Sequence, residues 1–257
     1  MSGLVALDLG PVAHLELVNP PLNLFTGALV LELRDALDRL ERADDVRAVV
    51  VSGRGERAFS AGSHVGEFED QAGEAGRDRH KLDQDVWRQL ADLPMPTIAA
   101  IEGHCLGGRQ PAAGQDQLLG PCGADDPRQP LRAAAARDDR QPYLGQAELR
   151  RLGRDPDVAA QRELQPAAEA EAIGLVNRVV PAGRAVAVAD EIGAEIASAG
   201  PVAVREAKQL IDTALERDIT AGLEAEFEAS ERIFATEDMV EGARAFFEKR
   251  DPVYRGR

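Results

Sequence analysis

The chain has 257 residues and a formal net charge of −15. Such a charge repels nucleic-acid phosphates, so we expect no nucleic-acid partner. Its two cysteines, Cys105 and Cys122, are too few for a disulfide framework and too widely spaced for a metal knuckle. The start MSGLVALDLG has no signal-peptide pattern, and no stretch reaches the roughly 18 apolar residues of a membrane span. We therefore expect a cytoplasmic protein without a membrane segment.

The first hundred residues predict a layered α/β sheet, because short apolar runs alternate with helical periodicity. Glycine, proline or asparagine breaks these runs at most of their ends. The expected elements are a hairpin of strands 4–9 and 12–17, a helix 27–43, a buried strand 46–52, a short apolar segment 58–62, an amphipathic helix 75–92 and a strand 97–101. From residue 186 onward the pattern predicts only helices, over 185–198, 202–216, 219–235 and 237–249.

Residues 109–166 break this pattern. They hold only nine Val, Ile, Leu, Met, Phe, Trp or Tyr residues in 58 positions, and composition alone is typical of a disordered insert. The stretch is rich in Arg, Gln, Pro, Ala and Gly, the residues that GC-rich DNA yields when it is read out of frame. Our hypothesis is that 109–166 is a frame-shifted reading, with a compensating shift near Pro166.

Two turns rich in small residues follow apolar segments, at Phe59–Ser63 and at Gly103–Gly108. Small residues after a strand allow a ligand to approach the backbone, where exposed N–H groups can bind an oxyanion. Neither turn has the Gly-Lys-Ser/Thr of a P-loop or the G-x-G-x-x-G of a dinucleotide site. Each turn alone is more often a purely structural connection.

Several motifs together resemble the crotonase superfamily, the enoyl-CoA hydratase/isomerase family, in order and spacing. They are Asn19-Pro with Leu22-Asn23, Arg47-Ala-Val-Val-Val, Ala58-Phe-Ser-Ala-Gly, the run from Pro96 to Gly108, Ala168-Glu-Ala-Glu-Ala-Ile-Gly-Leu-Val-Asn and Glu241-Gly-Ala-Arg-Ala-Phe-Phe-Glu-Lys-Arg. The resemblance covers residues 1–108 and 167–257. It implies an α/β fold with a crotonase-like ββα superhelix core and a C-terminal helical trimerisation region.

The resemblance also implies an oxyanion hole made of two backbone amides, those of Ser63 and Gly108. They would polarise the thioester C=O of an acyl-CoA and stabilise the enolate formed when a nucleophile adds at Cβ. CoA is then part of the substrate, and no separate cofactor and no metal are expected. The substrate and CoA contacts that it implies are Leu22, Asn23, Ala61, His64, Phe246 and Lys249. For the last two, an ordinary helix end with a C-terminal cation is an equal alternative.

The family's two glutamates are missing from this sequence. One positions and activates water and the other protonates Cα, and general acid–base help of this kind is worth about 10²–10⁴ in rate. Their positions are occupied by Pro111 and Leu131. Nearby acids, Asp116, Asp125 and Asp126, have no motif context.

The sequence thus predicts a core over 1–182 that carries the CoA site, and a C-terminal helical oligomerisation region over 183–257. The predicted function is syn hydration of a 2-enoyl-CoA in fatty acid metabolism, by a homotrimer or hexamer. Two alternatives stay open. One is another crotonase-fold enzyme, such as an isomerase, decarboxylase or thioester hydrolase. The other is a non-catalytic acyl-CoA-binding protein, because both glutamates are absent.

Overall fold

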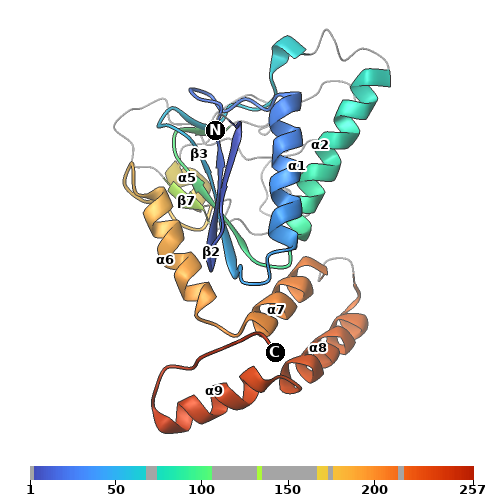
Figure 1. Ribbon diagram of the computed structural model, residues 1–257, viewed down its shortest axis with the longest axis vertical. Coiled ribbons are helices and arrows are strands. Elements are labelled where there is room, and N and C mark those ends of the chain that lie inside the picture. Colours follow the sequence, from blue (N-terminus) through green and yellow to red (C-terminus); the bar gives the residue numbers. More distant parts are fainter. Residues whose placement is uncertain (1–2, 68–73, 106–131, 135–166, 173–175, 214–216) are drawn as a thin grey trace.

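The computed structural model describes residues 3–67, 74–105, 132–134, 167–172, 176–213 and 217–257 (Figure 1). Its main sheet has the order β1-β2-β3-β5-β7, with strands β1 (Val5–Asp8), β2 (Val12–Leu17), β3 (Ala48–Gly53), β5 (Thr97–Ile101) and β7 (Arg132–Ala134). The three central strands β2, β3 and β5 are parallel, whereas β1 and β7 join antiparallel at the edges. Two short strands, β4 (Ala58–Ser60) and β6 (His104–Cys105), form a second, parallel sheet.

Helices cover both faces of the main sheet. Successive side chains of β3 point to opposite faces and so pack against different helices. Val49 and Val51 belong to the larger core, together with leucines of helix α1 (Gly27–Glu41). Val50 faces the other way, into a smaller cluster with helix α6 (Ala185–Ala197). The continuous apolar run of β3 thus follows from burial on both sides.

Helix α1 shows how the sequence fixes this packing. Its N-cap is Thr26, whose Oγ1 accepts the Leu29 N–H at 3.2 Å. Its apolar positions recur at helical spacing, and they bury Leu29, Val30, Leu33, Ala36, Leu37 and Leu40. Helix α2 (Glu74–Asp92) lies beside α1 (Figure 1) and places Val86 in the same core.

The remaining helices include two short ones and the C-terminal helices expected from the sequence. A short 3-10 helix, η1 (Val65–Glu67), precedes α2, and α5 (Ala167–Ala172) precedes α6. Helices α7 (Pro201–Thr213), α8 (Ile219–Phe234) and α9 (Glu237–Glu248) complete the chain, and Figure 1 shows α8 and α9 away from the sheet. Helix α7 is attached to the end of α2, because Lys208 Nζ donates to the Ala91 carbonyl at 2.7 Å. Among the described helices, none is long and apolar enough to cross a membrane.

The expected hairpin, strands and C-terminal helices are confirmed, with boundaries that differ by a few residues. Helix α6 begins just after the predicted boundary at 182/183, yet it packs on the core sheet. Of the stretch 109–166, the structure describes β7, which pairs with β5. The frame-shift hypothesis otherwise falls outside the described residues and stays a hypothesis.

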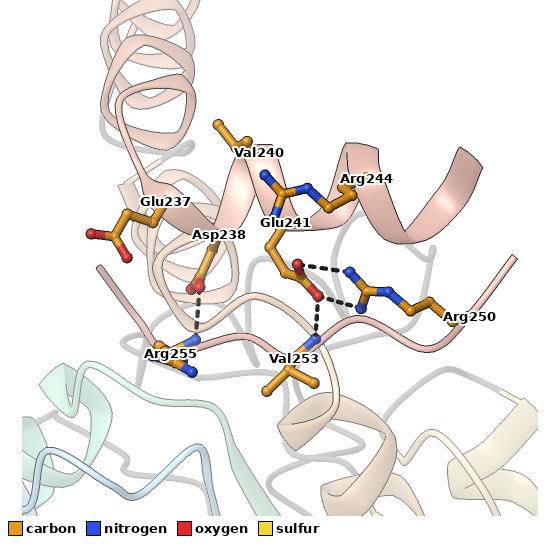
Figure 2. A pocket seen from close by; sticks show the side chains of 8 residues that line it. All are labelled: Glu237, Asp238, Val240, Glu241, Arg244, Arg250, Val253 and Arg255. Carbon is orange, nitrogen blue, oxygen red and sulfur yellow. Dashed lines mark hydrogen bonds and ion pairs between the residues drawn. The ribbon is translucent and has the colours of Figure 1, made fainter. Parts of the chain in front are cut away.

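After α9 the chain turns back and runs along the same helix as a C-terminal tail, residues 250–257 (Figure 2). The buried Asp238 carboxylate accepts the N–H groups of Arg255 and Gly256, both at 2.7 Å. Glu241 accepts two hydrogen bonds from the Arg250 guanidinium, at 2.6 and 3.0 Å, and one from the Val253 N–H at 3.0 Å. Two carboxylates of α9 therefore hold the tail.

The attachment through Glu241 should survive moderate acid. Its hydrogen bonds, first from Arg250 and then from the Val253 N–H, lower the pKa of Glu241 from 4.5 to about 2. Because the folded-state pKa is the lower one, this contact stabilises the attached tail fully above about pH 4.5 and is lost only as pH falls through about 2. We expect protection of the Val253 amide against hydrogen exchange, relative to its intrinsic rate, to be equal at pH 7 and at about pH 5, and to fall progressively as pH drops from about 4.5 to about 2.

Site-resolved hydrogen exchange across this pH range checks the expectation. The variant Glu241→Gln keeps the shape of the side chain but has no charge to titrate, so its exchange should show no acid transition of this origin. Loss of protection in the original chain that is already complete between pH 7 and about pH 5, or the same acid transition in Glu241→Gln, would contradict the assigned role of the ion pair.

Candidate oxyanion site

The two turns predicted to form the oxyanion hole begin at adjacent strands. Strands β4 and β6 pair in parallel, with Ala58 opposite His104 and Ser60 opposite Cys105. Their carboxyl ends therefore lie at the same edge of the small sheet. Ser63 follows β4 and lies within the described residues, whereas Gly108 lies outside them.

Close backbone contact before β6 explains one of the glycines. Gly103 has a φ of +69°, and a Cβ at this position would lie 2.3 Å from the Arg57 carbonyl oxygen. Any other L-residue would be strained there and would also collide with the chain before β4. The His104 N–H donates to the same Arg57 carbonyl at 3.0 Å. Gly103 thus permits the close approach of the two turns.

The amide of Ser63 is held in an orientation suited to a ligand. Phe25 forms an isolated parallel bridge with Ser63. The Phe25 N–H donates to the Gly62 carbonyl at 2.9 Å, and the His64 N–H donates to the Phe25 carbonyl at 3.2 Å. In a parallel bridge, the flanking residues make these bonds and the central residue directs its own N–H and C=O to the opposite side. Among the described residues, none accepts a hydrogen bond from the Ser63 N–H. A carbonyl oxygen of a ligand can therefore accept this N–H.

A network around Asn23 fixes the backbone that precedes this bridge. The Asn23 side chain is fully buried; its Nδ2 donates to the carbonyls of Arg54 and Ala58, at 3.0 and 2.8 Å, and its Oδ1 accepts the Asn19 N–H at 3.0 Å. Ser60 Oγ donates to the Asn23 carbonyl at 2.8 Å and accepts the Gly62 N–H at 3.1 Å. The side chain of Asn23 thus fixes the loop rather than facing a ligand.

The other residues of the predicted CoA contact at this end are close to one another. The Ala61 N–H donates to the Leu22 carbonyl at 2.8 Å, so these two segments that are expected to contact CoA are neighbours. Both residues are half-buried. Their contact with CoA stays a prediction, as no ligand contact of either residue is established.

His64 is half-buried and packs on the turn that contains Gly66. A Cβ at Gly66 would lie 2.7 Å from His64 Cε1 and 3.2 Å from Nδ1, so the missing side chain leaves space for the ring. Nδ1 is buried and has no hydrogen-bond partner among the described residues. The ring thus lies against the turn that follows Ser63, and its contact with substrate stays a prediction.

An ion-pair network adjoining the same turn was not predicted from the sequence. Arg79 of α2 is only 11% exposed and donates to Glu67 at 2.9 Å and to Asp83 at 2.8 Å. Burial raises the pKa of Asp83, and the hydrogen bond and charge of Arg79 oppose this rise. Charged residues at i and i+4 of an amphipathic helix usually form a solvated face, so the sequence held no signal for burial.

Phe246 and Lys249 lie far from Ser63 in the same chain. The tail attached to α9 lies at the amino end of β3. A Cβ added to Gly256 in this tail would be 3.2 Å from Nη1 of Arg47, the residue just before β3. The loop before Ser63 lies at the other end of β3, because Asn23 Nδ2 donates to the carbonyl of Arg54, the residue just after β3. The six residues of β3 separate these two ends by about 20 Å. Figure 1 likewise shows α9 beyond the end of α1 opposite to the end where η1 lies.

The side chains at the end of α9 are open to solvent. Phe246 is 79% exposed and meets Phe247 edge-on, with ring centroids 5.7 Å apart. Lys249 caps the helix in a left-handed conformation and forms no ion pair with a described residue. The next residue, Arg250, forms ion pairs with Glu241 and Glu248.

A cleft of about 560 Å³ lies between α9 and the tail, and Figure 2 shows both signs of charge around it. Its lining residues are Glu237, Asp238, Val240, Glu241, Arg244, Arg250, Val253 and Arg255. In the described part of the chain, no three His, Cys, Asp or Glu side chains are grouped so that they could hold a metal ion. The positions of the family glutamates, Pro111 and Leu131, lie outside the described residues.

Known proteins resemble this chain along most of its length. The chain is 32% identical to the short-chain-enoyl-CoA hydratase of Clostridium acetobutylicum over 248 residues, which cover 94% of this chain and 93% of that protein. It is 29% identical to the crotonyl-CoA hydratase of Syntrophomonas wolfei, with 91% and 90% covered. The crystal structure of enoyl-CoA hydratase from Bacillus anthracis aligns with a TM-score of 0.76 at 27% identity, covering 99% of this chain and all of that one.

A family model described as enoyl-CoA hydratase/isomerase matches residues 10–110 and 157–257. The two matched segments leave out most of residues 109–166, the stretch in which the sequence has no regular apolar periodicity. They contain the Ser63 turn, the Gly103–Gly108 turn and all four C-terminal helices. The chain belongs to the enoyl-CoA hydratase/isomerase family, and its fold is the crotonase fold.

Proposed function

We propose that this protein is an enoyl-CoA hydratase-type enzyme, which adds water across the C=C bond of a 2-enoyl-CoA. The observation that carries the proposal is the Ser63 N–H, which the bridge to Phe25 leaves free and fixed in direction. Membership of the family and two relatives named as hydratases support the same chemistry. The proposal includes a cytoplasmic location and a place in fatty acid metabolism.

The proposed step follows from where charge develops. The thioester C=O accepts the N–H groups of Ser63 and Gly108, and this draws electron density from Cβ. Water oxygen adds at Cβ and loses a proton, and the former C=C electron pair moves to form an enolate whose charge rests on the thioester oxygen. Protonation at Cα completes the addition. A preorganised donor stabilises this charge more than the ground-state carbonyl.

Ser63→Pro is the variant that removes the proposed donor, because proline has no N–H. We expect kcat for crotonyl-CoA hydration, followed by loss of the enoyl absorbance, to fall about 10²–10³-fold, as for loss of one oxyanion donor. Ser63→Ala is the matched control: it keeps the N–H and should keep the rate. An equal loss in both variants would assign the effect to the side chain, and no loss in either would refute the role of this amide.

The two proton transfers need groups that the sequence does not supply at the family positions, Pro111 and Leu131. A chain with these residues should bind and polarise the thioester but hydrate it slowly, because each missing group costs about 10²–10⁴ in rate. An intact mass of the protein that equals the mass of the sequence would refute the frame shift. Retained CoA binding without turnover would then favour a non-catalytic acyl-CoA-binding protein.

Another crotonase-fold activity, as an isomerase, decarboxylase or thioester hydrolase, uses the same polarised carbonyl. It differs from hydration in the groups that follow Gly108. Product identification after incubation with crotonyl-CoA separates these activities, because only hydration yields the 3-hydroxyacyl thioester.

We also infer a homotrimer or hexamer assembled through the C-terminal helices. Large apolar side chains are exposed on α8 and α9, namely Ile219, Leu223, Phe227, Phe234, Val240, Phe246 and Phe247. Ile219, Leu223 and Phe227 recur every four residues and so form one stripe on α8. A second copy of the chain would bury this stripe, and it would allow Phe246 and Lys249 to serve the site of a neighbouring subunit.

Phe227→Glu should weaken this assembly, because it places a charge in the apolar stripe. We expect sedimentation to show a shift from trimer or hexamer toward the monomer. Leu31→Glu, on the exposed side of α1 at 43% exposure, is the matched control and should leave the assembly intact. A monomeric original chain at micromolar concentration would contradict the inference.

A further inference from the structure

Arg79 joins three segments that meet beside Ser63. Its guanidinium donates to Asp83 on the same helix at 2.8 Å, to Glu67 in η1 at 2.9 Å and to the carbonyl of Phe25 at 3.3 Å. A guanidinium holds its donors in one rigid plane, so these bonds fix the relative positions of their acceptors. The side chain is 11% exposed, and such a site is little screened by solvent.

Glu67 extends the same connection to the start of α1. Its Oε2 accepts both the Arg79 guanidinium and the Gly27 N–H, each at 2.9 Å. Gly27 is the first residue of α1, where backbone N–H groups have no partner within the helix. A Cβ at Gly27 would lie 3.2 Å from Arg79 Nη1, so the absence of a side chain gives the guanidinium its space.

The acceptor Phe25 is the residue that orients the proposed oxyanion donor. Its carbonyl accepts the His64 N–H and the Arg79 guanidinium, and its N–H bonds Gly62. Arg79 and Glu67 therefore act on both sides of Ser63, on the bridge partner and on the turn that follows. Lys81, two residues along α2, forms a comparable pair with Asp85, but its side chain is 73% exposed and the pair is on the surface.

We propose that Arg79 is a positioning residue for the oxyanion hole: with Glu67 it holds Phe25 and the 62–67 turn so that the Ser63 N–H points at the thioester oxygen. This inference rests on the proposed function. It adds a group that acts on the Ser63 amide through Phe25 and through the 62–67 turn and not by contact with the substrate. A misplacement of a donor by about 1 Å can cost about 10²-fold in rate, so kcat is expected to fall by up to this factor in Arg79→Ala while KM changes little.

The test uses 4-dimethylaminocinnamoyl-CoA, a thioester whose absorbance moves to longer wavelength as its carbonyl is polarised. The spectrum is recorded at saturating protein, so that weaker binding does not reduce the shift. It needs no turnover, and the missing glutamates do not affect it. Arg79→Lys, Arg79→Ala and the matched surface control Lys81→Met are compared with the original chain, and each is melted to confirm that it is folded.

We expect the original chain and Lys81→Met to give the same red shift, and both Arg79 variants to give a smaller one. Millimolar guanidinium should restore part of the shift in Arg79→Ala. If Arg79 contributes to stability alone, its variants will melt earlier but give the full shift at saturation, and this outcome would overturn the proposal. Arg79→Lys supplies the test if Arg79→Ala does not fold. No shift in the original chain would refute the proposed function itself, and this inference with it.

Discussion

The two hydrogen bonds that Phe25 makes on either side of Ser63 set the geometry on which the proposed chemistry depends. They satisfy the carbonyl of Gly62 and the N–H of His64, and they leave the N–H of Ser63 directed away from Phe25. An amide on a mobile loop would stabilise the developing charge less, because it would have to reorient as the charge forms. Here Phe25 is itself only 6% exposed and meets Trp87 edge-on, with ring centroids 4.9 Å apart. The proposed oxyanion donor is therefore oriented by a residue of the hydrophobic core.

The arrangement of parallel strands separates two tasks at opposite ends of the sheet. Asn23, β4 and the turn with Ser63 lie at the carboxyl end of β3. Ligands of parallel sheets commonly bind outside this end of the strands. The amino end of β3 lies by the C-terminal tail, which is attached to α9. The exposed aromatic side chains of α8 and α9 thus lie on helices far from the chain's own candidate site, which agrees with the inferred assembly. A site completed by a neighbouring subunit would couple CoA binding to oligomerisation.

The main elements of the fold could be predicted from the sequence because they follow simple periodicities. The leucines of α1 recur at helical spacing, and the valines of β3 form the continuous run of a strand buried on both faces. Ser63 was predicted through its motif context, and its role stays a prediction. Arg79 and Glu67 were missed because burial of a charged side chain depends on partners distant in sequence, here Phe25 and Gly27. The side chain of Asn23 likewise fixes the loop through Arg54 and Ala58, 31 and 35 residues away, and local pattern could not show this.

The central claim is that the backbone N–H of Ser63 polarises the thioester carbonyl of a bound acyl-CoA. Replacing the amide that precedes Ser63 with an ester, by incorporation of the corresponding α-hydroxy acid, deletes this one donor and keeps the side chain. The carbonyl stretching frequency of a bound enoyl-CoA analogue, measured by Raman difference spectroscopy, reports the polarisation directly. The account predicts that the lowered frequency seen with the original chain rises toward the value in water when the ester is present. An unchanged frequency in the ester variant would contradict it.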